Sequence, residues 1–366
     1  MLGYPKPRGL GPCAGRAAGD APRTSTPSGP LSPNDSYARH VVTAVIVAHD
    51  GAAWLPNVID ALLGQTRPVQ RVVAVDTGSR DRSGAVLAER LGQQVVFGMD
   101  RRTGYGAAVA RAVTHRSATV PVGLPAGVAD SERVEWLWLL HDDSEPAPDA
   151  LEQLLRGATE TRSAAVLGPK VMDWADRQVI LEAGMTIDTA GRRITGVEPR
   201  EVDQGQHDGD DDTLAVSSPG MLIRRDVWEK TGGFDPAMTL FREDTDLCWR
   251  VHAAGFRVRV ITDAVMYHVE ATARRRRSVS VTRHPARLNR ANALITLLGN
   301  LPARQAAVSL AGNLGVSLLR TMFFLVAKRF RAARTRTSSC ATPRSTRVSR
   351  SSSATMARRR RSRRTR

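Results

Sequence analysis

The chain has 366 residues, of which 42% are hydrophobic, so it can bury the core of one large domain or two ordinary ones and is not disordered as a whole. Its formal net charge of +17 is unevenly spread: fifteen Lys and Arg residues and no acidic residue lie in 328–366, which leaves a net charge of +2 for the rest. The three cysteines are scattered, which excludes a disulfide scaffold or a zinc pattern and fits a reducing compartment.

Strand-like and helix-like segments alternate from residue 40 onward. The run 41–48 is apolar and β-branched on both faces, as in a central parallel strand, and an amphipathic helix follows it. The unit then repeats, and the predicted elements of this half are strands 41–48, 71–75 and 95–97 and helices 55–63, 81–91 and 104–115. This order predicts an α/β fold with a doubly wound, mostly parallel sheet and flanking helices.

The second half of the chain is less regular. A loop over 117–131 leads to a buried strand at 136–140 and a helix at 149–157. We then expect short strands at 166–167, 179–182 and 214–218, a polar surface loop at 204–212, a bend at 220–223 into a short helix at 226–231, a helix at 243–254, a strand at 256–261, and C-terminal helices at 285–299 and 303–327.

Two adjacent carboxylates, Asp142 and Asp143, directly follow the strand 136–140 and His141. In open α/β sheets, ligands bind at the carboxyl ends of the strands. Carboxylate oxygens at that edge suit Mg²⁺ or Mn²⁺ holding the phosphates of a substrate. The alternative is a solvated turn whose acidic residues cap the next helix.

Other candidate residues stand at the ends of predicted elements in the same way. Asp76 follows a strand, and because neighbouring parallel strands share one crevice it can lie near the acidic pair and accept a hydrogen bond from a pyrimidine base. Asp244 heads a helix and can act as general base toward an acceptor hydroxyl. Both could equally cap a helix, and His268, a candidate Mn²⁺ ligand, could equally be structural.

Five motifs, in order along roughly residues 40 to 300, resemble family-2 glycosyltransferases of the GT-A fold, and look most like the bacterial rhamnosyltransferase and galactofuranosyltransferase branch. The motifs are Thr43-Ala-Val-Ile-Val-Ala-His-Asp50, Val75-Asp-Thr-Gly-Ser-Arg-Asp81, His141-Asp-Asp-Ser-Glu-Pro146, Gly233-Phe-Asp-Pro236 and Glu243-Asp-Thr-Asp-Leu-Cys-Trp-Arg250.

The resemblance implies inverting transfer of a sugar from a UDP- or dTDP-sugar to a hydroxyl of a glycan or lipid-linked acceptor. It implies Mn²⁺ or Mg²⁺ as cofactor, with Asp143 and His268 as metal ligands and Asp244 as catalytic base. On the acceptor side we expect Gly220 and Glu243. On the nucleotide-sugar side we expect Ala48, Asp50, Asp76, Ser79, Gly104 and Asp142.

Two positions depart from the family pattern. Many relatives have a third Asp where this chain has His141, which bears on the geometry of the metal site. The usual Asn after the first strand is Asp50 here, which bears on the contact with the base.

The sequence also bears on three alternative functions. A sugar-phosphate nucleotidylyltransferase would share the sheet and the metal-binding acids, but it would need a glycine-rich loop with Arg or Lys directly after the first strand. An NAD-type oxidoreductase is excluded because His49-Asp-Gly-Ala-Ala stands in place of a glycine-rich turn. The basic tail offers a nucleic-acid-binding protein, but 331–366 contains no aromatic residue and predicts only non-specific, salt-sensitive binding.

The helix 303–327 has a possible role at a membrane. Asn313 and Arg320 make it a poor spanning segment and a better interfacial or packing helix, and the basic residues after it suit an anionic cytoplasmic leaflet. We therefore expect a cytoplasmic enzyme at the inner face of the plasma membrane; the alternative is a helix packed on its own domain. Its apolar residues at i, i+4 spacing are Leu310, Leu314, Leu318, Met322 and Val326.

These observations divide the chain into four regions. We expect a disordered segment at 1–39, without the apolar run of a signal peptide, and the GT-A glycosyltransferase domain at 40–272. A helical, membrane-associated region follows at 273–330 and a basic disordered tail at 331–366. The Arg-, Ser- and Thr-rich tail has the composition of an out-of-frame reading of a GC-rich gene, so it is either a frameshift product or a genuine disordered segment.

Overall fold

The computed structural model describes residues 39–115, 132–209, 211–274, 276–277, 280–282 and 284–339, with side chains as far as 328. Residues 1–38 of the segment predicted at 1–39, the loop predicted at 117–131 and residues 340–366 of the tail predicted at 331–366 lie outside the described residues. Residues 331–339, predicted as disordered, continue helix α9. The strands are β1 His40–Ala48, β2 Arg71–Asp76, β3 Val96–Gly98, β4 Val134–His141, β5 Ser144–Pro146, β6 Ala164–Asp173, β7 Ile180–Glu182, β8 Thr186–Ile187, β9 Arg193–Ile194, β10 Asp211–Asp212, β11 Leu222–Arg224 and β12 Arg257–His268. The helices are α2 Leu55–Leu63, α3 Ser83–Leu91, α4 Tyr105–Thr114, α5 Ala150–Glu160, α6 Arg225–Thr231, α7 Glu243–Ala253, α8 Pro285–Asn300 and α9 Ala303–Ser339, with a 3₁₀ turn η1 at Gln93–Val95.

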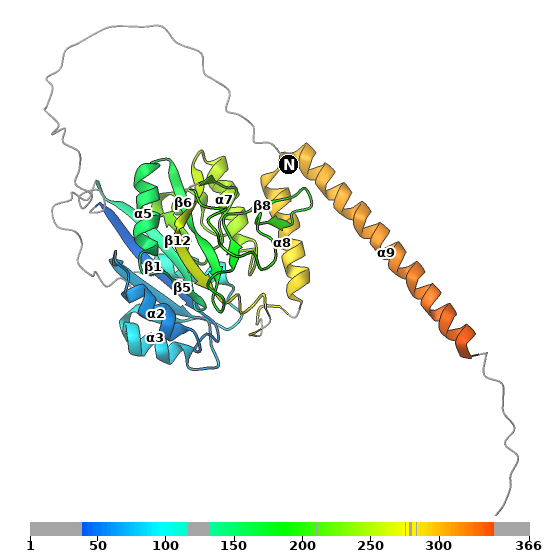
Figure 1. Ribbon diagram of the computed structural model, residues 1–366, viewed down its shortest axis with the longest axis horizontal. Coiled ribbons are helices and arrows are strands. Elements are labelled where there is room, and N and C mark those ends of the chain that lie inside the picture. The colour runs from blue at the N-terminus through cyan, green and yellow to red at the C-terminus, as the bar shows by residue number, and fades with distance from the viewer. Residues whose placement is uncertain are drawn as a thin grey trace, which may run out of the picture. The chain divides into compact units, whose positions relative to one another are not determined.

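Within the described residues, ten strands form one mixed, mostly parallel sheet (Figure 1). The main path runs β10-β12-β6-β11-β4-β1-β2-β3, with β1 parallel to both β2 and β4 and β12 parallel to β6. The short strand β11 lies antiparallel between β4 and β6. The predicted α/β sheet with flanking helices is confirmed, and β11 joins its two parallel halves.

The apolar strands explain how both faces of the sheet are covered. Successive side chains of a strand point to opposite faces, so β1 contributes Ile46 to one buried cluster and Val45 to the other. Helices α2, α3 and α5 pack in the first cluster, and α4, α6 and α7 pack in the second. Because helices cover both faces, the carboxyl ends of the parallel strands are where an open α/β sheet leaves room for a ligand.

Several predicted elements need correction. The segment 214–218 is not a strand: it has one isolated bridge at Ala215, although Ala215 and Val216 are buried. The predicted bend at 220–223 is right only at its start: Gly220 lies in a turn, but Leu222 and Ile223 belong to β11, where Leu222 pairs with β4 and β6 at once. The strands predicted at 166–167 and 256–261 are longer, as β6 and β12, since they pair with each other along their length.

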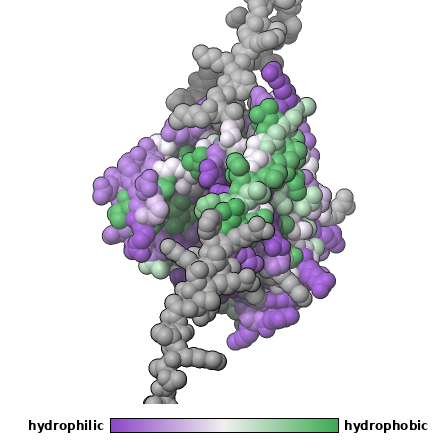
Figure 2. Space-filling view, turned by 90° about the vertical axis from the view of Figure 1, so that its right-hand side faces the viewer, coloured by the Kyte–Doolittle hydropathy of each residue, from purple (hydrophilic) through white to green (hydrophobic). Residues whose placement is uncertain are grey.

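Helix α9 carries exposed apolar side chains around its circumference. Its segment Ala303–Lys328 is long and apolar enough to cross a membrane and is almost entirely unburied. Five consecutive residues, Met322 to Val326, are each between 47% and 69% exposed, so they cover more than one face of the helix. Figure 2 shows hydrophobic residues gathered in one band on the face that it presents. The predicted one-sided stripe is therefore too narrow a description of this helix.

Candidate active site

A cavity of about 370 Å³ lies at the carboxyl end of the sheet. Its wall includes the ends of β1, β4 and β12, at Val47, His141 and His268. Val47 and His141 are paired in register, so the carboxyl ends of these two strands lie side by side at the cavity. Six residues predicted for the site line this cavity: Gly104, Asp142, Asp143, Glu243, Asp244 and His268.

Asp142 is held in a fixed orientation by its two carboxylate oxygens. Its side chain is 1% exposed; Oδ2 accepts a hydrogen bond from the His49 backbone N–H at 2.7 Å, and Oδ1 accepts one from Arg277 Nη1 at 2.5 Å. Burial is the main cause that raises the pKa of Asp142 to about 6, against the opposing charge of Arg277. Gly51 packs directly on this carboxylate, since a side chain there would overlap it.

Asp143 turns to the other side of the loop. Its Oδ2 accepts a hydrogen bond from the Ala271 N–H at 2.9 Å, while Oδ1 is buried and lacks a hydrogen-bond partner of good geometry among the described residues. Burial opposes ionisation, but the charges of His268 and Arg277 hold the pKa of Asp143 far below its usual range.

Three potential metal ligands meet at this oxygen. Oδ1 of Asp143 lies 3.3 Å from His268 Nε2 and 4.0 Å from His141 Nδ1. These three ligand atoms lie within 4.8 Å of one another. Burial, with a smaller contribution from His268, lowers the pKa of His141 to about 3, so its imidazole is neutral and able to ligate.

The sequence motifs mark His141 only as a departure from the family pattern and do not predict it as a metal ligand. The signal was present, because residues two apart in an extended chain point the same way, and His141 stands two before Asp143. Its other ring nitrogen, Nε2, lies 2.9 Å from Ser218 Oγ, which fixes the ring.

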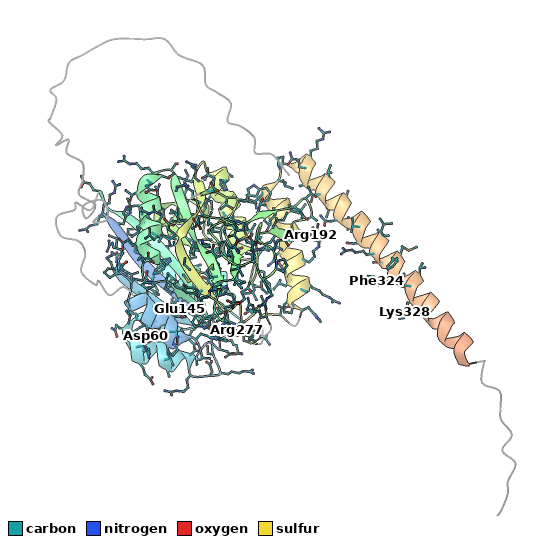
Figure 3. All side chains as sticks on the ribbon, in the orientation of Figure 1. Asp60, Glu145, Arg192, Arg277, Phe324 and Lys328 are labelled. Carbon is teal, nitrogen blue, oxygen red and sulfur yellow. The ribbon has the colours of Figure 1, made fainter. Side chains whose placement is uncertain are left out.

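The sequence also contains no indication that Arg277 belongs to the site. Its Nη1 bonds Asp142 and also donates to the His49 carbonyl at 3.1 Å, its Nη2 lies 3.5 Å from Asp143 Oδ1, and its Nε donates to Thr272 Oγ1 at 2.9 Å. Figure 3 labels Arg277 at the same end of the sheet as Glu145, which follows β4. The charges of Asp142 and Asp143 raise the pKa of Arg277 despite burial.

The start of α7 supplies the acidic residues on the opposite wall. Asp244 is 7% exposed, and its Oδ1 accepts hydrogen bonds from the Thr245 N–H at 2.6 Å and the Thr245 hydroxyl at 3.1 Å. Burial, followed by the charge of Asp244, raises the pKa of Glu243 to about 8, so Glu243 is protonated at neutral pH. The turn before the helix is strained, since Arg242 has a φ of 73°, and Arg242 Nε is anchored on Asn289 Oδ1 of α8 at 2.7 Å.

The four other nucleotide-side residues gather beside the cavity without lining it. Ala48 and Asp76 are paired in register, and the Asp50 N–H donates to Ser79 Oγ at 2.9 Å. The Asp50 carboxylate is bound by both terminal nitrogens of Arg101, which lowers the pKa of Asp50 to about 2.

The Asp76 carboxylate is held less tightly by its neighbours than the Asp50 carboxylate. Among the described residues, the Asp76 carboxylate accepts hydrogen bonds only from the Ser79 N–H, and these are long, at 3.3 and 3.4 Å. His49 and Thr77, next in sequence to Ala48 and Asp76, do line the cavity, so this group borders it.

Two glycines complete the predicted set. A side chain at Gly104 would overlap the Thr239 carbonyl, so glycine there permits a close approach of backbone to backbone at the cavity wall. Gly220 has a φ of 86° and packs against Pro169, and its carbonyl accepts a hydrogen bond from Trp138 Nε1 at 3.1 Å. Gly220 itself does not line the cavity, whereas its neighbour Pro219 does.

Residues 38–287 match the family described as glycosyltransferase like family 2, and the chain belongs to that family. It is therefore a glycosyltransferase, as the sequence motifs predict, and family membership favours this over a nucleotidylyltransferase.

Curated relatives agree with the predicted branch. The chain is 26% identical over 251 residues to N-acetylglucosaminyl-diphospho-decaprenol L-rhamnosyltransferase of Mycobacterium tuberculosis, covering 63% of this chain and 76% of the relative. It is 24% identical to the O-antigen chain rhamnosyltransferase RfbN of Salmonella typhimurium, covering 62% and 66%. It is also 24% identical to the galactofuranosyltransferase GlfT1 of Mycolicibacterium smegmatis, covering 59% and 66%.

Among solved structures, the chain is similar to GalNAc-T7 crystallised with UDP, GalNAc and Mn²⁺, with a TM-score of 0.49 and 16% identity over 62% of this chain and 43% of the other.

Proposed function

We propose that the protein transfers a sugar, with inversion at the anomeric carbon, from a UDP- or dTDP-sugar to a hydroxyl of a glycan or lipid-linked acceptor. One observation supports this best: the ligand cluster around Asp143 and the carboxylate of Asp244 line one cavity, although 101 positions separate them in sequence. The diphosphate of a donor and the hydroxyl of an acceptor could therefore meet in the same space.

We infer that Mn²⁺ is held by Asp143, His268 and His141. One carboxylate and two imidazoles suit Mn²⁺ better than Mg²⁺, which prefers oxygen ligands alone. The buried Oδ1 of Asp143, which lacks a good hydrogen bond from the described residues, fits a position that a cation completes. When bound, the ion would supply Lewis-acid chemistry, offsetting charge on the departing nucleoside diphosphate.

Asp244 would take the proton of the acceptor hydroxyl as that oxygen attacks the anomeric carbon. Both hydrogen bonds from Thr245 go to Oδ1 of Asp244, which orients the carboxylate and leaves Oδ2 for the incoming proton. Glu243, neutral beside it, can donate a hydrogen bond on the acceptor side.

The base and ribose of the donor would lie over the ends of β1 and β2. The Asp76 carboxylate would accept a hydrogen bond from the nucleotide base, because its existing hydrogen bonds are long. Asp50 would act indirectly, through its ion pair with Arg101 beside the ends of β1 and β2. Gly104 would border the nucleotide at the cavity wall.

We further propose that the acceptor is lipid-linked and that α9 attaches the enzyme to the cytoplasmic face of the plasma membrane. The name of the Mycobacterium tuberculosis relative states a lipid-linked acceptor. The 26 residues of Ala303–Lys328, at about 1.5 Å each, exceed the roughly 30 Å thickness of a bilayer core. In this scheme residues 40–272 form the catalytic domain, and 273–330 form a membrane-associated extension that also contributes Arg277 to the cavity.

A donor screen tests the proposed function. The full chain is incubated with a panel of UDP- and dTDP-sugars and polyprenyl-linked or glycan acceptors, with Mn²⁺ or with EDTA, and release of nucleoside diphosphate is measured. We expect Mn²⁺-dependent release with one donor class, and NMR of the product should show an inverted anomeric configuration. Metal-independent release, or a retained configuration, would contradict the proposal.

A further inference from the structure

The guanidinium group of Arg277 lies between the carboxylates of Asp142 and Asp143. Nη1 bonds Asp142 Oδ1 at 2.5 Å and Nη2 lies 3.5 Å from Asp143 Oδ1. The Arg277 side chain is only 12% exposed, and both carboxylates are 1% exposed. The acidic pair thus already has a cation partner, supplied by the chain itself.

A metal ion bound at Asp143 would have to share this oxygen with Arg277. Asp143 Oδ1 is the atom that His141 and His268 approach, and a divalent cation bound there would stand close to Nη2 of Arg277. Two positive charges repel strongly at that spacing in a buried site. Through these two contacts Arg277 already balances one of the two carboxylate charges.

The anchors of Arg277 lie on both sides of the pair. Nε is bonded to Thr272 on its own segment, whereas the terminal nitrogens are bonded across to Asp142 and to the His49 carbonyl at the end of β1. A rotation of the side-chain end would release the terminal nitrogens into the cavity that Arg277 lines. There the planar, two-pronged guanidinium suits phosphate oxygens.

We propose that the guanidinium group of Arg277 stays bound to Asp142 and Asp143 in the free enzyme, and that it moves onto the diphosphate of the donor when the metal ion binds. The inference rests on the proposed function, in which the cavity receives a nucleoside diphosphate. It assigns Arg277 two opposite effects: it weakens binding of the metal alone and strengthens binding of the nucleotide together with the metal.

The test replaces Arg277 by Gln, which keeps much of the length and loses the charge. Binding of Mn²⁺ alone is measured by the EPR signal of the free ion, and binding of UDP and of dTDP at saturating Mn²⁺ is measured by calorimetry. In Arg277→Gln we expect Mn²⁺ alone to bind about tenfold more tightly. We expect the nucleoside diphosphate to bind roughly ten- to a hundredfold more weakly, as for a lost charge-assisted hydrogen bond.

Arg274→Gln is the matched control. Arg274 lies on the same segment and is also ion-paired, but with Asp173 and Glu270, which are not part of the acidic pair. Both affinities should stay near those of the wild type in this variant. Thermal unfolding of each variant shows whether the fold is kept.

The outcomes are distinct. If Arg277→Gln weakens binding of both Mn²⁺ and nucleotide, Arg277 is structural and the proposal is overturned. It is also overturned if wild-type protein binds UDP or dTDP equally well without metal and only Arg277→Gln loses that binding, since Arg277 would then replace the ion. Failure of the proposed function would show differently, as absence of sugar transfer by wild-type protein whose Mn²⁺ and nucleotide affinities still follow the expected pattern.

Discussion

Gly51 leaves just enough room for the carboxylate of Asp142. A methyl group at Gly51 would overlap Asp142 Oδ2, which is the oxygen fixed by the His49 N–H. We predict that Gly51→Ala displaces this carboxylate and lowers metal-dependent turnover roughly a hundredfold, as for a misplacement of about 1 Å. Steady-state kinetics with saturating Mn²⁺ measure it. The control is Gly98→Ala at the end of β3, where an added methyl meets no atom within 4 Å; wild-type rates in both variants would refute the role of Gly51.

Replacing the base should separate chemistry from binding. Asp244→Asn keeps the shape and the contacts with Thr245 but cannot accept the acceptor proton, so we predict a fall in kcat of about 10²- to 10⁴-fold. The affinity for UDP or dTDP with Mn²⁺, measured by calorimetry, should not change. Near-wild-type transfer by this variant would remove Asp244 from the role of base.

Glu243 makes the free energy of unfolding decrease as the pH rises. Its pKa is raised from the ordinary value of 4.5 to about 8 by burial and by Asp244, so the folded state binds a proton that the unfolded state releases above pH 4.5. The contribution of this proton to the free energy of unfolding is full below pH 4.5 and is lost as the pH rises through about 8. We predict that wild-type protein loses stability relative to Glu243→Gln between pH 5 and 9, on the order of a few kcal/mol. Urea unfolding of both proteins across this range checks it, and parallel pH profiles would contradict it.

Residues next to a recognisable strand end could be predicted, and residues brought in from far along the chain could not. Asp142, Asp143 and His268 follow apolar strands, so their meeting at one sheet edge follows from parallel topology. Arg277 stands in a run of four arginines with no periodicity, and nothing local indicates that one of them crosses to β1 and β4. Arg101 was missed for the same reason, since its partner Asp50 lies 51 positions earlier.

Helix α5 shows how closely the helices are fitted to the sheet. Its Gly157 faces Ile261 of β12, and a methyl group there would overlap the Ile261 side chain. Gly299, near the end of α8, has open space in the same position. Both changes to Ala gain helix propensity of up to about 1 kcal/mol, but at Gly157 overpacking costs about 1–3 kcal/mol.

We therefore predict opposite signs for the two substitutions. Gly157→Ala should lower the free energy of unfolding, and Gly299→Ala should raise it slightly, as measured by denaturant titration under identical conditions. Stabilisation by Gly157→Ala would show that α5 is more loosely packed on β12 than the structure indicates.

Periodicity predicted the helices and central strands well, because each of their patterns is complete within a short segment. Helices α2 and α7 begin and end close to the predicted residues. The segment 214–218 and the strand β11 were misread because pairing depends on which segment occupies the slot between β4 and β6. Either apolar segment could fill that slot by composition, and only the antiparallel register decides it.

For the chain as a whole, α9 predicts attachment to lipid. Leu319 and Phe323 are 71% and 69% exposed on this helix. We predict that the full chain sediments with vesicles containing anionic lipid and stays bound in high salt, because burial of apolar side chains is not screened. The double substitution Leu319→Glu and Phe323→Glu should release it, whereas Leu63→Glu, at an apolar position on α2 that is 58% exposed, should not. Release of the wild-type chain by salt alone would assign binding to the basic tail.

The central claim is that ligands from strands far apart in the chain hold one Mn²⁺ beside the donor diphosphate. Pulsed EPR of Mn²⁺ bound to the full chain with UDP or dTDP tests it most directly, because imidazole nitrogens in the metal shell give resolved couplings. The account predicts nitrogen couplings from His141 and His268, which end β4 and β12, with the His268 coupling lost in His268→Ala. A spectrum without nitrogen coupling, from Mn²⁺ bound through oxygen alone, would contradict it.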